Sequence, residues 1–236
     1  MNDEKAELLK GYGEKKAWDS GYPWIFYVAR PVSFPLTLFL RRLGATPDGI
    51  TGLTAVLGLA SLPTLASGSP GAMFWGGLFL LLYTIFDCVD GNLARAWPQT
   101  ASRAGKYWDG LVGNFYILSY FALGIGLGGE TWPVIGAFVT IAKLLACRVK
   151  TDFWATLGGS WEAAKKDSGY LPHTGTLPYK VYYNLTDPQA HIFILPFAAL
   201  YGFGAWFLGA SALLSAADLV FVTALYLGRS AKLNKK

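Results

Sequence analysis

Six long apolar stretches restrict the fold of this chain more than any other feature of its sequence. A helix that crosses the hydrocarbon core of a bilayer needs about 20 consecutive, mostly apolar residues. Only 15% of the residues are charged, against about 25% in soluble domains. We therefore predict an all-α integral membrane protein with six transmembrane helices. The predicted spans cover residues 47–67, 72–97, 105–127, 132–156, 188–209 and 211–229.

The basic residues predict how these spans are oriented. Lys and Arg occur before the first span, between the second and third, between the fourth and fifth, and after the sixth. The other three connections contain none. Because short loops rich in Lys and Arg stay in the cytoplasm, we expect both termini to be cytoplasmic. With five or seven spans, the basic connections would no longer all fall on one side of the membrane. It also explains the net charge of +5 without nucleic acid as a partner.

The spans divide the chain into a cytoplasmic N-terminal region (1–45), a transmembrane domain (46–230) and a basic tail (231–236). An aromatic stretch from Trp18 to Phe39 is punctuated by Arg30, Arg41 and Arg42, and it predicts an amphipathic helix over 30–43 at the cytoplasmic membrane surface, with a plain linker as the alternative. The first twenty residues lack the apolar core of a signal peptide, so we expect no cleavage. The connection 157–186 exceeds the usual limit of about 12–15 residues, which indicates a functional loop.

Three aspartates lie where the second and third predicted spans meet the cytoplasm. Asp87 and Asp90 are three residues apart and project from one helix face, while Asp109 begins the next, antiparallel span. Carboxylates inside a membrane are costly and indicate function. They repel each other unless a cation intervenes, and all-oxygen ligands suit Mg²⁺ or Mn²⁺. We therefore predict a metal site. The alternative is a set of structural ion pairs with the neighbouring Arg95, Arg103 and Lys106.

Small residues accompany the three acids. Gly91, Ala94 and Gly105 lie on the same helix faces and would let a bulky phosphorylated ligand approach the backbone. Arg95 is suited to hold a phosphate oxygen. These residues extend the predicted metal site into a site for a phosphorylated ligand.

The segment from Asp87 to Asp109 resembles the signature of the CDP-alcohol phosphotransferase family, D-x-x-D-G-x-x-A-R, a spacer and G-x-x-x-D-x-x-x-D. The six-helix plan, the interfacial helix and Thr46-Pro47 at the first span are similar to the family as well. Members displace CMP from a CDP-linked alcohol, often CDP-diacylglycerol, with an acceptor hydroxyl. The resemblance implies metal binding by Asp87, Asp90 and Asp109. It also implies that four residues contact the CDP moiety, namely Gly91, Ala94, Arg95 and Gly105.

The chain departs from the family pattern at two positions. The last Asp of the signature is replaced by Gly113, and Asp48 stands where the family commonly has Asn. In the family that last Asp helps to hold a second metal and is the expected general base. Its absence predicts either an acceptor that is already ionised or another base. His191, the connection 157–186 and the substrate itself are the candidates.

Further polar residues lie in the predicted spans. Lys143 and Arg148 are candidates for binding an anionic group of the acceptor, with anchoring at the cytoplasmic helix end as the alternative. Asp109 is expected to act in catalysis as well as to bind metal. Gly124 and Gly128 form a small-xxx-small pair that packs helices or forms a homodimer.

These features favour a membrane enzyme that uses Mg²⁺ or Mn²⁺ to transfer a substituted phosphoryl group from a CDP-alcohol to a small polar or lipid acceptor. Such a reaction makes phospholipids or related head groups, here with an unusual or anionic acceptor as one option. The alternative is a non-catalytic homologue that binds a CDP-alcohol or a lipid. A transporter would place its polar groups near the bilayer midplane, and the one-sided cluster argues against that.

Overall fold

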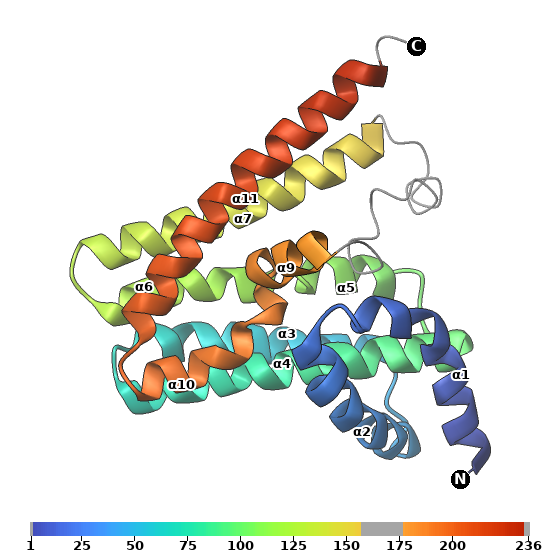
Figure 1. The fold of residues 1–236 in the computed structure, drawn as a ribbon. Helices are drawn as coiled ribbons and strands as arrows, with labels where there is room; N and C mark the ends of the chain where they lie inside the picture. The colour runs from blue at the N-terminus through green and yellow to red at the C-terminus, as the bar shows by residue number, and fades with distance from the viewer. Residues whose placement is uncertain (1, 157–176, 234–236) are drawn as a thin grey trace.

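The computed structural model describes residues 2–156 and 177–233, and every regular element in these two ranges is helical. The predicted all-α class is confirmed in this part of the chain (Figure 1). Five helical segments of the described residues are long and apolar enough to cross a membrane. The predicted number of six such helices is not confirmed.

Three helical segments precede the first span. They are α1 (Asn2–Asp19), the π-helix η1 (Ile25–Ala29) and α2 (Arg30–Arg42). The helix predicted over 30–43 is present as α2, and its interfacial position remains a prediction. The sequence analysis did not predict α1, which packs against α4 (Pro70–Ala96).

The first two spans form a tight antiparallel hairpin. Helix α3 (Pro47–Ala66) begins at Thr46, whose side chain accepts a hydrogen bond from the backbone N–H of Gly49. Such a cap satisfies one of the free N–H groups of a helix start. The turn into α4 depends on Gly68, whose φ of 73° lies in the left-handed region. The hairpin brings Thr51 of α3 beside the aspartates of α4.

The third predicted span is not one regular helix. It consists of α5 (Gly105–Val112), the 3-10 helix η3 (Phe115–Leu118) and α6 (Ser119–Leu127). The break falls at Gly113 and Asn114, at the position where the family signature ends. Asp109 therefore lies on a short separate helix.

Side chains from other helices satisfy backbone carbonyls beside this break. The Tyr83 hydroxyl donates a hydrogen bond to the carbonyl of Val112 at 2.5 Å. The Thr140 hydroxyl donates to the carbonyl of Ile117 at 3.2 Å. A bilayer offers no water to free backbone groups, so a broken helix within it needs partners of this kind.

The last part of the chain differs most from the prediction. Helix α9 (Leu177–Thr186) lies in the predicted loop 157–186, whose remaining residues 157–176 fall outside the described ranges. The predicted fifth span is broken into short helices, two of which carry a proline, Pro188 or Pro196, in their first turn. The chain turns at Gly202, with φ of 75°, and not at residue 210 as predicted. The pieces are η5 (Pro188–Ala190), η6 (Ile192–Ile194), α10 (Leu195–Leu200) and α11 (Gly204–Leu233).

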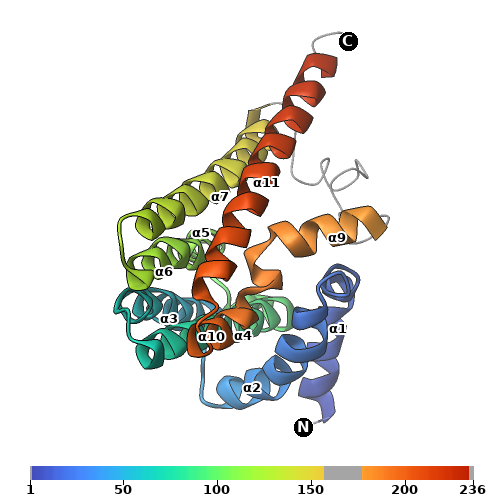
Figure 2. The same cartoon turned by 60° about the vertical axis from the view of Figure 1, so that its left-hand side comes forward.

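The helices form one bundle around a shared core. Buried Leu80, Tyr83, Leu123, Leu195 and Leu208 join α4, α6, α10 and α11. Helix α11 packs along α7 (Thr131–Thr156), and Figure 2 shows this pair leaning away from α3 and α4.

Apolar side chains also point away from the bundle. On α11, Trp206 is 79% exposed and Leu213 is 77% exposed. Large outward-facing apolar residues are unfavourable in water and suit contact with lipid. In Figure 1 the start of α1 and the end of α11 lie toward the right, and the turns after α3, α6 and α10 lie at the left. Which of these ends faces the cytoplasm remains a prediction.

Candidate active site

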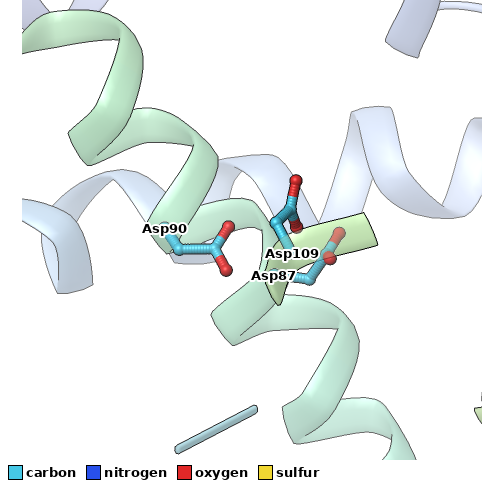
Figure 3. A group of neighbouring side chains, drawn as sticks. All are labelled: Asp87, Asp90 and Asp109. Atoms are coloured by element: carbon cyan, nitrogen blue, oxygen red, sulfur yellow. The ribbon is translucent and has the colours of Figure 1, made fainter. Parts of the chain in front are cut away.

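Three carboxylates converge where α4 and α5 meet. One oxygen atom from each of Asp87, Asp90 and Asp109 lies within 4.8 Å of the others, and Figure 3 shows the Asp90 side chain pointing toward Asp87 and Asp109. The convergence predicted from the sequence spacing is therefore present. Three carboxylates this close together repel one another unless a cation lies between them.

The environments of the three carboxylates differ. Asp90 is buried, and its Oδ2 accepts a hydrogen bond from the Thr51 hydroxyl at 2.9 Å. Asp87 is half-buried and Asp109 is exposed. Neither has an ion pair or a side-chain hydrogen bond to another described residue. The three acids are thus not a set of structural ion pairs with neighbouring basic residues, and their oxygens fit a hard divalent ion such as Mg²⁺ or Mn²⁺.

A cavity of about 270 Å³ opens beside Asp90 and Asp109. We call it the donor cavity. It contains the four residues that the family resemblance assigns to the CDP moiety, together with Asp48 and Thr51 of α3. Its walls are formed by Pro47, Asp48, Thr51, Asp90, Gly91, Ala94, Arg95, Ala101, Ser102, Gly105, Lys106 and Asp109.

Two glycines shape the donor cavity by close approach. A Cβ atom on Gly105 would collide with the Asp48 carboxylate, so a larger residue here would require the Asp48 side chain to move. A Cβ atom on Gly91 would lie 2.8 Å from a guanidinium nitrogen of Arg95. The guanidinium donates a hydrogen bond to Asn92 at 3.2 Å, and its Nε is buried without a partner in the described residues. A donor that lacks an acceptor suits a ligand oxygen.

A buried polar network fixes the N-terminal segments against the other side of α4. Arg30 pairs with Asp19 at 2.5 Å and donates to Asn92 at 2.8 Å. The Asn92 amide donates to Ser33 and Thr37 of α2. Charges buried in this way need partners with good geometry, so the network specifies how α1 and α2 lie beside the aspartates.

The structure adds Lys15 of α1 to the site, a residue that the sequence analysis did not single out. Lys15 and Asp87 line a small cavity of about 140 Å³, the bridging cavity. The ammonium therefore shares this cavity with the Asp87 carboxylate, without an ion pair within the described residues. Burial lowers the pKa of Lys15 below its usual 10.5, and the charges of Asp19 and Asp87 oppose this shift. No motif could reveal it, because the contact depends on how α1 docks.

A further cavity of about 190 Å³ lies between α7, α9 and α11, and we call it the lateral cavity. Trp18, Tyr22 and Asp187 line both this and the bridging cavity, so the two share a wall. Lys143, predicted to bind an anion, lines the lateral cavity and donates to the carbonyl of Thr186 at 2.9 Å.

Two candidates are not brought to the aspartates. Arg148 is exposed and pairs with Asp152 at 2.6 Å. His191 lies 3.2 Å from the Tyr120 hydroxyl and packs against Phe207. His191 lines neither the donor nor the bridging cavity.

Gly124 of the predicted small-xxx-small pair packs within the chain. A Cβ atom added there would collide with the carbonyl of Trp132. This contact uses Gly124 to join α6 to α7, and a homodimer remains a prediction.

The fold and the site together define a helical protein with membrane-length apolar segments and three converging carboxylates beside an open cavity. The chain belongs to the CDP-alcohol phosphatidyltransferase family, whose model matches residues 45–215. The match includes all three aspartates and the donor cavity, and excludes α1 with Lys15.

Two relatives carry the same printed name, phosphatidylinositol phosphate synthase. The protein of Streptomyces avermitilis is 36% identical over 101 residues, which cover 41% of this chain and 39% of the relative. The protein of Mycobacteroides abscessus is 38% identical over 69 residues, covering 28% of this chain and 29% of the relative. The chain thus matches less than half of the length of either.

Proposed function

We propose that this protein transfers a phosphatidyl-type group from a CDP-alcohol to an acceptor hydroxyl and releases CMP. The acceptor oxygen would bond to the phosphorus atom that carries the alcohol, and the bond from this phosphorus to CMP would break. The observation that carries the proposal is the convergence of three carboxylates within 4.8 Å, without a basic partner among the described side chains.

Asp87, Asp90 and Asp109 would hold a divalent ion, Mg²⁺ or Mn²⁺. When bound, such an ion neutralises the diphosphate and stabilises the leaving CMP. Thr51 orients the Asp90 carboxylate through its hydrogen bond. Arg95 has a buried Nε free to bind a donor oxygen. Gly91 and Gly105 have no side chains that would fill the donor cavity beside these groups.

We propose an anionic acceptor, which would enter through the lateral cavity. Lys143 and Lys150 line this cavity, and neither is in an ion pair among the described residues. Asp187 and Asp218 line it as well, and their carboxylates accept hydrogen bonds from the Tyr22 and Tyr182 hydroxyls. The relatives' printed name is that of a synthase of phosphatidylinositol phosphate, and a phosphorylated polyol as the acceptor fits that name. A phosphate near neutral pH can also accept the proton of the attacking hydroxyl, because its second pKa is about 6. The substrate itself would then replace the base missing at Gly113.

The experiment is CMP release from CDP-diacylglycerol by the purified protein with Mn²⁺ and a panel of acceptors. The panel should include inositol, an inositol monophosphate, glycerol and glycerol 3-phosphate. We expect CMP release with a phosphorylated acceptor and little with its neutral counterpart. Equal rates with both would contradict an anionic acceptor.

The same assay addresses the second candidate function. The loss of the last signature Asp at Gly113 favours a homologue that binds a CDP-alcohol without turning it over. Saturable binding of CDP-diacylglycerol, without CMP release from any acceptor, would support that candidate and contradict the first.

A further inference from the structure

Helix α1 lies outside the matched family domain, yet its Lys15 lines the same small cavity as Asp87. Its C-terminal half carries Lys15, and its docking onto α4 is extensive. The Trp97 indole N–H donates to Glu7, and Gly11 lies so close to α4 that an added Cβ atom would be 3.0 Å from the backbone nitrogen of Ala96. The position of Lys15 beside Asp87 is therefore specified by packing.

Some of the charged residues near Lys15 already have an ion-pair partner, and others have none. Asp19 forms an ion pair with Arg30 at 2.5 Å. Arg30 and Arg95 are cations and repel the ammonium. Asp87 and Asp109 are acids without an ion-pair partner in the described ranges. Lys15 itself is in none of the ion pairs there, and its ammonium lies 5.1 Å from the Trp18 ring centroid. Asp87 is thus the member of the aspartate cluster that shares the bridging cavity with Lys15, while Asp187, which also lines it, accepts hydrogen bonds from the Tyr22 hydroxyl and the backbone N–H of Gln189.

We propose that Lys15 is a tethered counter-cation of the aspartate cluster, so that this site takes one divalent ion where a fourth carboxylate would support two. Three carboxylates carry three negative charges. One divalent ion balances two of them, and the ammonium balances the third. At Gly113 there is no side chain to add a fourth charge. The inference rests on the proposed function only in requiring that the aspartates bind a divalent ion.

The test is a calorimetric Mn²⁺ titration of the full chain without substrate. The wild type should bind one ion. Because an ammonium repels a divalent ion at short range, Lys15→Gln should lower the dissociation constant of Mn²⁺ by about ten-fold and permit a second, weaker ion. Lys15→Met, which keeps the apolar stem, should do the same, and Lys15→Arg should resemble the wild type. Lys16→Gln is the matched control, because Lys16 is the exposed neighbour.

The inference would be overturned if Lys15→Gln bound Mn²⁺ with the same affinity and stoichiometry as the Lys16→Gln control. It would also be overturned if Lys15→Gln bound Mn²⁺ more weakly than this control. The double variant Lys15→Gln with Gly113→Asp should bind two Mn²⁺ ions with similar affinity. A double variant that binds one ion would also count against the inference. A wild type that binds no Mn²⁺ would overturn the metal-dependent function as well. Normal Mn²⁺ binding in a protein that releases no CMP would leave this inference standing and contradict only the proposed reaction.

Discussion

At the scale of single residues, the side chains of Asp90 and Asp109 are held in place by different surroundings. Asp90 is buried on a long helix and hydrogen-bonded to Thr51. Asp109 is exposed on the short helix α5, and its position depends on the break that follows it. The rigid side of the site is therefore the α3–α4 hairpin.

The Thr51 hydrogen bond gives the first prediction. Partners that orient a metal ligand typically contribute about 10–100-fold to metal affinity or activity. Thr51→Val should therefore lower Mn²⁺ affinity by about this factor, and Asp90→Ala should lower it further. Thr54→Val is the matched control, because Thr54 is buried on the same helix and bonds only to the carbonyl of Ile50. Equal Mn²⁺ affinities for the two Thr variants would contradict this role of Thr51.

Gly113 gives the second prediction. A positioned base typically contributes about 10²–10⁴-fold to rate, so a degraded site should recover when its carboxylate is restored. An anionic acceptor would instead be repelled by the new charge. We expect Gly113→Asp to lower CMP release with the native acceptor, or to shift preference toward neutral alcohols.

The control for this variant is Gly110→Asp, which adds the same charge one turn earlier, where a Cβ atom meets nothing within 4 Å. A side chain at Gly113 is tighter, with its Cβ 3.0 Å from the Asp109 carbonyl. A Gly113→Asp protein that is orders of magnitude faster than wild type with the native acceptor would show that the site only lacks its base.

At the scale of elements, the broken third span connects membrane packing to the site. A regular helix through residues 105–127 would carry Asp109 in line with α6. The break instead sets α5 apart, with Tyr83 holding the carbonyl of Val112. The α4–α5 geometry of the aspartates thus depends on a hydrogen bond outside the signature.

The third prediction is that Tyr83→Phe destabilises the protein by about 1–3 kcal/mol, the usual cost of leaving a buried carbonyl unsatisfied. Thermal unfolding in detergent measures this change. Tyr107→Phe is the control, because Tyr107 is 70% exposed on α5. Identical unfolding temperatures for the two variants would exclude a structural role for the Tyr83 hydroxyl.

Apolar length alone predicted the spans now seen as α3, α4 and α7, and the i, i+3 spacing predicted the pairing of Asp87 with Asp90. These are local properties of the sequence. The division of residues 188–229 was predicted wrongly, because apolar content does not locate the turn at Gly202. Lys15 and Thr51 were missed because long-range packing brings them to the site.

At the scale of the whole molecule, the charge distribution and the bundle agree. The basic connection between α4 and α5 lies at the same end of the bundle as the start of α1 and the end of α11, and the turns after α3, α6 and α10, which contain no Lys or Arg, lie at the other. Under the positive-inside rule, the aspartates would then face the cytoplasm.

The fourth prediction tests this orientation in a cysteine-free background. Gln99 and Glu130 are both exposed and lie in connections at opposite ends of the bundle. In intact cells, a membrane-impermeant thiol reagent should label Glu130→Cys and spare Gln99→Cys until the membrane is opened. The reverse pattern would invert the topology and place the site outside.

The central claim is that this chain moves the phosphatidyl-type group itself. Its most direct test uses CDP-diacylglycerol labelled at the phosphorus atom next to the lipid, with purified protein, Mn²⁺ and an inositol monophosphate as the phosphorylated acceptor. The account predicts that the label appears in a new acceptor-linked lipid, with an equal amount of unlabelled CMP, and that Asp109→Asn abolishes both. Label that remains in CDP-diacylglycerol, or that enters phosphatidic acid regardless of acceptor, would contradict it.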